Sequence, residues 1–185
     1  MRKYLRQGMT IVVVFATIVW SIGISALLPT MVRAVDVTVS GPTDLLPSAG
    51  MMMPANSMDA VVMKFSLNKT AGGSETLSNV TVTVTSTQPT NNATLSGHIA
   101  NLSVFKDSNA NNYFDPESDL VAGAQTTVNI GSATTITTGS NNSLASDGAL
   151  PTTFFVTIRT GAGWTTGDSV DMSMAADGIA TSANS

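Results

Sequence analysis

Apolar and polar residues alternate along most of this chain after residue 34, which is the pattern of half-buried β-strands. In the clearest example, residues 77–85, Val80, Val82 and Val84 face one way and threonines face the other. Similar patterns predict further strands at 35–39, 58–67, 99–105, 120–121, 126–130, 134–138, 153–159 and 169–175. Short strands at this spacing, with no helical segments between them, predict an all-β fold, an antiparallel β-sandwich.

The same alternation predicts which side chains form the core. We expect the inward faces of the strands at 58–67, 153–159 and 169–175 to carry Val61, Met63 and Phe65, then Phe154, Val156 and Ile158, then Val170, Met172 and Met174. Clusters of Gly, Pro, Asn and Ser predict loops around 41–54, 68–73, 88–97 and 139–148.

The first 34 residues have a different pattern, that of an N-terminal hydrophobic helix. A basic head at residues 1–6 precedes an uncharged, mostly apolar run at 9–28, and Val32 and Ala34 provide a signal-peptidase site. The segment is therefore a signal peptide cleaved before Val35, or an uncleaved anchor that contacts the membrane only through residues 9–28.

A third interpretation is a prepilin leader, because Gly8 precedes a long apolar run, although Val13 stands where prepilins carry Glu. All three interpretations place the rest of the chain outside the cytoplasm, extracellular or at the cell surface. We therefore divide the chain into a leader at 1–34, an N-terminal strand and linker at 35–57, and a β-sandwich domain at 58–185.

Composition narrows the chemistry of the exported part. The chain has no cysteine, which excludes disulfides, zinc–thiolate sites and iron–sulfur clusters. Four of the 8 Lys and Arg residues lie at or before Arg33, and all 12 Asp and Glu residues follow it, so the exported part has a net charge of −8. Such a surface repels nucleic acid and anionic lipid and attracts cations.

Oxygen-bearing side chains recur in the segment 107–119, which lies between two predicted strands. Asp107, Asn109, Asn111 and Asp115 occupy positions 1, 3, 5 and 9 of an EF-hand-type calcium loop, and the carbonyl of Tyr113 occupies position 7. Asn112 replaces the usual Gly at position 6, and Ser118 replaces the usual Glu at position 12, with Glu117 and Asp119 on either side to serve instead. We expect a structural Ca²⁺ site, and the competing interpretation is a solvated turn.

This segment, with the strand before it, resembles the calcium loops of Ig-like modules in large bacterial and archaeal surface proteins, including S-layer and adhesin-like proteins. Residues 53–65 and 154–159 resemble the first and late strands of such modules, so that the similarity extends over roughly residues 50–180. The resemblance implies an Ig-like β-sandwich that carries calcium structurally and acts as a spacer or lattice unit.

Residues that would support catalysis are scarce. His98 is the single histidine, and we find no nucleophile elbow and no phosphate-binding Gly-rich loop, so we expect no enzymatic activity. We expect a non-enzymatic, calcium-stabilised structural module of a cell-surface protein, in contact with neighbouring modules or copies in a surface assembly. The alternatives are an adhesive or carbohydrate-binding module, with Trp164 stacking on a polysaccharide, and a pilin-like filament subunit.

Overall fold

A computed structural model describes residues 36–45, 51–52, 55–86, 97–146, 149–164 and 169–182. Chain contacts separate two units, Met1–Arg33 and Ala34–Ser185, and every element named below belongs to the second. The predicted leader and its hydrophobic helix lie outside the described residues. Within those residues, no helix has the length and apolar character needed to span a bilayer.

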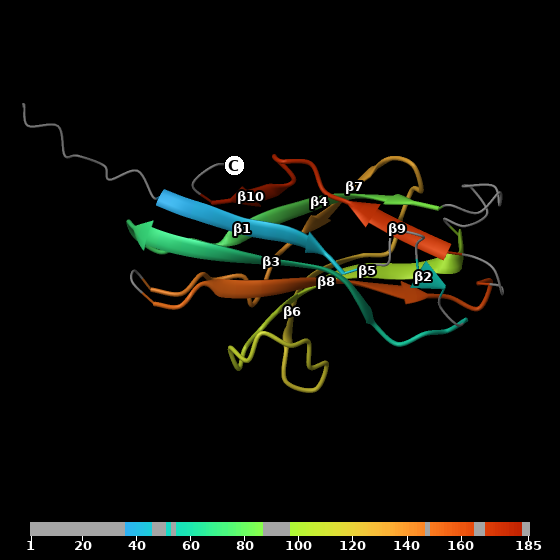
Figure 1. The fold of residues 1–185 in the computed structure, drawn as a ribbon, viewed down its shortest axis with the longest axis horizontal. Coiled ribbons are helices and arrows are strands. Elements are labelled where there is room, and N and C mark those ends of the chain that lie inside the picture. Colours follow the sequence, from blue (N-terminus) through green and yellow to red (C-terminus); the bar gives the residue numbers. More distant parts are fainter. Residues whose placement is uncertain are drawn as a thin grey trace, which may run out of the picture. The chain divides into compact units, whose positions relative to one another are not determined.

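All elements of the described residues are strands, and Figure 1 labels them in chain order. They are β1 Asp36–Asp44, β2 Met51–Met52, β3 Ala60–Ala71, β4 Leu77–Thr85, β5 Ile99–Lys106, β6 Leu120–Gln125, β7 Ala133–Thr137, β8 Thr152–Thr160, β9 Ser169–Ser173 and β10 Ile179–Thr181. One sheet has the order β1-β3-β8-β5-β6, and the second has the order β10-β4-β9-β2, with β7 paired to β4. All of these pairs are antiparallel, which confirms the predicted all-β, antiparallel class.

Side chains from both sheets form one hydrophobic core. Val80, Val82 and Val84 on β4 are buried, as the alternation predicts. In the first sheet Phe65 stacks on Phe154, with ring centroids 5.5 Å apart and ring planes 18° from parallel. The predicted inward residues Met63, Val156, Ile158, Val170 and Met172 are also buried. Period-two patterning therefore identifies most of the core.

Some predicted boundaries are wrong. The segment 126–130 is not a strand, although Val128 and Ile130 are buried in the core. Its side chains reach the core from a turn, which Gly131 holds by donating its N–H to the carbonyl of Val84 at 2.8 Å. Residues 68–71, predicted as a turn, continue β3 because they pair with β1. Tertiary pairing and burial override the local pattern in both places.

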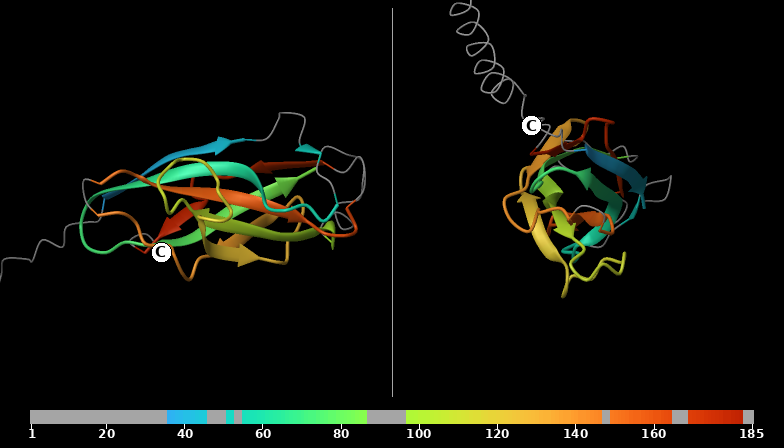
Figure 2. Two further views of the ribbon diagram at one scale, coloured as in Figure 1. Left: turned by 90° about the horizontal axis from the view of Figure 1, so that it is seen from below. Right: turned by 90° about the vertical axis from the view of Figure 1, so that its left-hand side faces the viewer.

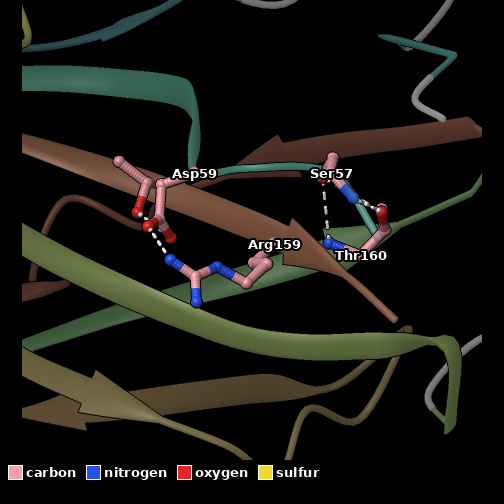
Figure 3. A network of polar contacts seen from close by, with 5 residues as sticks. Ser57, Asp59, Arg159 and Thr160 are labelled. Carbon is pink, nitrogen blue, oxygen red and sulfur yellow. Dashed lines mark hydrogen bonds and ion pairs between the residues drawn. The ribbon is translucent and has the colours of Figure 1, made fainter. Parts of the chain in front are cut away.

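A polar network ties the chain before β3 to the end of β8 (Figure 3). Thr160 donates its N–H to Ser57 Oγ at 3.1 Å, and Ser57 donates its N–H to Thr160 Oγ1 at 2.9 Å. Beside them Arg159 forms an ion pair with Asp59, whose carboxylate also accepts a hydrogen bond from Thr157. Reciprocal bonds of this kind hold the entry to β3 in register with β8.

We expect Thr160→Val to lower the free energy of unfolding by about 1–3 kcal/mol, because the substitution leaves the N–H of half-buried Ser57 without its acceptor, the buried Thr160 hydroxyl. The matched control is Thr135→Val, since Thr135 Oγ1 lies 2.9 Å from Thr81 Oγ1 but is exposed to water. Urea denaturation measures both variants. Equal losses of stability in the two variants would show that the hydrogen bond from the Ser57 N–H to Thr160 Oγ1 stabilises the fold no more than an exposed one does.

Candidate metal centre

The segment 107–119 joins β5 to β6 as the yellow-green loop beside β6 in Figure 1. Its two ends are buried, with Asp107 and Asp119 each only 6% exposed. Ser108 links these ends, since it donates its N–H to Asp119 Oδ1 at 3.3 Å and its hydroxyl to the carbonyl of Ser118 at 2.5 Å. The loop is therefore closed at its base by Asp119.

The first half of the loop is a series of side-chain-capped turns. Asn109 Oδ1 accepts the N–H of Asn111 at 3.1 Å, and Asn111 Oδ1 accepts the N–H of Tyr113 at 2.8 Å. Asp107 Oδ2 accepts the N–H of Asn112 at 2.8 Å. Asn112 has a φ of 65°, the left-handed conformation for which such loops usually carry glycine. The alternating side-chain oxygens thus turn back toward the loop backbone.

The second half of the loop separates the two carboxylates that were candidates for closing the site. The carbonyl of Asp115 accepts the N–H groups of both Ser118 and Asp119, which closes a tight turn that contains Pro116. This turn brings Asp119 Oδ2 to 2.8 Å from the N–H of Asp115, inside the loop. Glu117 is exposed. Asp119 is therefore the carboxylate in position to complete a metal site.

Two buried carboxylates in one short loop carry an electrostatic cost. Among the described residues, neither Asp107 nor Asp119 has a Lys or Arg partner, and Asp107 Oδ1 is buried with no hydrogen-bond partner. An unpaired buried charge is strongly unfavourable unless a cation or hydrogen bonds compensate it. Backbone N–H groups compensate part of this charge, at both oxygens of Asp119 and at Asp107 Oδ2. A cation bound beside Asp107 Oδ1 would compensate the rest.

The structure brings only some of the predicted metal ligands together. Asp107 and Asp119 lie together at the base, Asp115 is half-buried, and Asn109, Asn111, Tyr113 and Glu117 are exposed. Within the described part of the chain, no three His, Cys, Asp or Glu side chains lie close enough to hold a metal by themselves. A cation here would rely on amide and carbonyl oxygens besides two or three carboxylates, which is a ligand set that Ca²⁺ accepts.

An aromatic cluster mounts the loop on the first sheet, on the face away from the core. Phe114 of the loop packs edge-on against Phe105 of β5, with ring centroids 5.0 Å apart, and against Phe155 of β8, with centroids 5.8 Å apart. The ammonium of Lys64 lies 5.8 Å from the centroid of the Phe155 ring. Phe155 is only 2% exposed, so the loop buries a sheet face that would otherwise meet water.

Asn112 fixes the loop to the strands below it. Its side-chain oxygen accepts a hydrogen bond from Thr153 Oγ1 at 3.0 Å, and its carbonyl accepts one from Lys64 Nζ at 2.9 Å. Because the N–H of Asn112 is bound to Asp107, this residue couples the buried carboxylate to β3 and β8. In the sequence Asn112 stands only where such loops usually carry glycine, and nothing beside it indicates this anchoring role.

A cavity of about 620 Å³ adjoins the loop. Its lining includes Ser66, Lys106, Asp107, Asn112 and Leu150, and so combines both signs of charge with apolar surface. Burial lowers the pKa of Lys106, whose Nζ donates a hydrogen bond to the carbonyl of Ser143 at 2.7 Å. A small polar molecule could enter this space without disturbing the core.

The hypothesis of a sugar-stacking tryptophan does not fit the structure. Trp164 is only 3% exposed and belongs to the hydrophobic core, so its ring presents no face to solvent. Trp164 therefore serves as a packing residue of the core. His98 is half-buried in front of Ile99, and its ring lies against Gly163.

Comparison with protein-family models finds no match for this sequence, and comparison with curated proteins finds none either.

Proposed function

We propose that this protein is an exported, non-enzymatic structural module of a cell surface, an Ig-like β-sandwich stabilised by a calcium ion in the loop 107–119. Two antiparallel sheets that share one core support the sandwich arrangement. The leader pattern and the acidic exported part support the location. In this proposal the ion has a structural role and not a regulatory one. The strands β5 and β6 flank the loop, and they are not a helix pair that could open on binding.

One observation carries the calcium proposal, namely the pair of buried carboxylates at the base of the loop, for which the described part of the chain provides no basic partner. In this proposal Asp107 and Asp119 hold the ion from the two ends of the loop, with Asp115 beside them. Asn109, Asn111 and the carbonyl of Tyr113 complete the shell. In this proposal Glu117, which is exposed, lies outside the shell.

The ion stabilises the fold by binding the folded loop and not the unfolded chain. It neutralises part of the charge of the two buried carboxylates, which are costly to bury alone. Since the loop also covers the aromatic cluster of Phe105, Phe114 and Phe155, calcium binding and packing on the first sheet strengthen each other.

Isothermal titration calorimetry tests the proposal. We expect one Ca²⁺ per chain with a Kd on the order of 10⁻⁴–10⁻³ M, the range of extracellular calcium modules. Mg²⁺ should bind more weakly, because it dehydrates reluctantly and demands near-ideal octahedral geometry. An absence of binding at calcium concentrations of about 10 mM would leave the solvated turn as the better interpretation.

A carbohydrate-binding or adhesive module is the second candidate, and the cavity beside the loop favours it. Its hydroxyls, amide, ammonium and carboxylate could bind sugar hydroxyls, while Leu150 and Pro151 offer apolar contact. A glycan array distinguishes the candidates. Binding that Asn112→Ala abolishes would favour the module with a ligand, and no binding would favour the purely structural one.

A further inference from the structure

Strand β1 has an open outer edge. It is the end strand of its sheet and pairs with β3 alone among the described strands. Residues 38–45 are all exposed, and Val39 keeps 46% of its surface in contact with water. In the left view of Figure 2, β1 runs along the upper margin of the ribbon with no coloured strand beyond it. Between Val37 and Ser40, every second residue therefore presents backbone groups that no described strand pairs with on this side.

Only one half of this edge is protected against pairing with another chain. Edge strands are usually guarded by Pro, Lys, bulges or inward charges. The second half of β1 has such a guard, because Pro42 lacks an N–H and the pairing with β3 is irregular between Ser40 and Thr43. The first half has a register shift only at its start, between Asp36 and Val37. From Val37 to Ser40 its pairing with β3 is regular, and residues 36–40 contain no Lys, Arg or Pro.

We propose that residues 36–40 pair antiparallel with the same residues of a second copy, about a two-fold axis through Thr38. This proposal rests on the proposed role as a structural module of a cell surface, where it gives the contact between two copies of the chain. A two-fold contact uses the same patch on both chains, and a strand paired with itself meets that requirement.

The sequence of the segment suits this register. Val37 lies opposite Val39 of the copy, a β-branched pair that stabilises antiparallel strands. Asp36 lies opposite Ser40 of the copy, so the two Asp36 residues are not placed face to face. The sheet β1-β3-β8-β5-β6 of one copy would then continue into the same sheet of the second copy across the axis.

Two physical properties follow from this contact. A pairing of five residues is smaller than a stable interface, so dimers should form weakly and gain strength only when many copies are held together. The exported part has a net charge of −8, so salt should favour pairing by screening the repulsion between copies.

The absence of cysteine from the chain permits a sharp test. In this register the two Thr38 residues lie directly opposite, with Cα atoms about 4.5–5.5 Å apart, which is within the span of a disulfide. Under mild oxidation we expect the full chain carrying Thr38→Cys to form a disulfide-linked dimer. The matched control is Thr43→Cys, equally exposed on β1 but beyond Pro42, which should remain mostly monomeric. The apolar segment 9–28 is present in both variants, so any association of chains through it affects the two dimer yields equally.

A second substitution separates pairing from chance collision. Val39→Lys, added to Thr38→Cys, should abolish the cross-link while the melting temperature stays close to that of Thr38→Cys, because Val39 is exposed. Equal cross-linking of Thr38→Cys and Thr43→Cys, or cross-linking that survives Val39→Lys, would overturn the proposed contact. If the cross-link is absent while calcium still binds, the contact between copies is wrong and the calcium-stabilised module stands. The two proposals can therefore fail separately.

Discussion

Phe155→Ala is expected to lower the free energy of unfolding by about 3–5 kcal/mol, the usual cost of truncating a fully buried phenylalanine. Phe155 is only 2% exposed, although it lies on the face of the sheet away from the core. Its ring contacts Phe114 of the loop and lies beneath the Lys64 ammonium. Removal would leave a cavity under the loop and loosen its attachment. Urea denaturation measures the loss.

Tyr113→Ala is the matched control, since Tyr113 precedes Phe114 in the same loop but is 77% exposed. We expect this variant to stay within about 0.5 kcal/mol of the original protein, as most exposed substitutions do. A loss below about 1 kcal/mol for Phe155→Ala would contradict the aromatic mount, because it would place the loop off the sheet in solution.

Calcium is expected to raise the melting temperature. For a Kd of 10⁻⁴–10⁻³ M, about 10 mM Ca²⁺ should stabilise the folded state by roughly 1.4–2.7 kcal/mol relative to EDTA. For a domain of this size that corresponds to an increase of roughly 3–10 °C. Asp119→Asn should remove this increase, because it keeps the shape of the side chain but takes away a charge at the base of the loop.

Glu117→Gln is the control for that experiment. It removes the same charge two residues away, from an exposed side chain outside the proposed shell, and should keep the full response to calcium. If Glu117→Gln lost the response and Asp119→Asn kept it, the closing ligand would be Glu117 and the orientation of the second half of the loop would differ from that described above.

Much of the fold could be predicted from the sequence because the core strands alternate cleanly. Val80, Val82 and Val84 on β4, and Phe154, Val156 and Ile158 on β8, are buried as period-two patterning requires. The pattern fails at 126–130, where apolar residues enter the core from a turn. It also gives no indication of β10, Ile179–Thr181, which exists through its pairing with β4.

The loop was harder to predict than the strands. The spacing of Asp107, Asn109 and Asn111 predicts inward-turning oxygens, but Glu117 and Asp119 are equivalent in the sequence. Only the turn after Asp115, closed by two hydrogen bonds to its carbonyl, brings Asp119 inward. Adjacent Phe154 and Phe155 did contain a signal for the aromatic mount, since neighbouring strand residues face opposite ways and one of the two rings must leave the core.

The loop 107–119 connects its two buried carboxylates to the pairing of the strands on either side. Asp107 lies at the end of β5 and Asp119 immediately before β6, so an ion bound by both would close the loop between two paired strands. Asn112 connects the carboxylate of Asp107 to Thr153 and Lys64 on the neighbouring strands. The proposed ion would therefore act as a structural clamp on the first sheet.

A crystal structure of the protein grown with calcium tests this claim most directly. We predict an anomalous scatterer inside the loop, bound by six to eight oxygens at about 2.3–2.6 Å, with Asp107 and Asp119 among its ligands. Glu117 should remain in solvent. A loop that keeps the same hydrogen bonds, with only water around Asp107 and Asp119 at saturating calcium, would contradict the account.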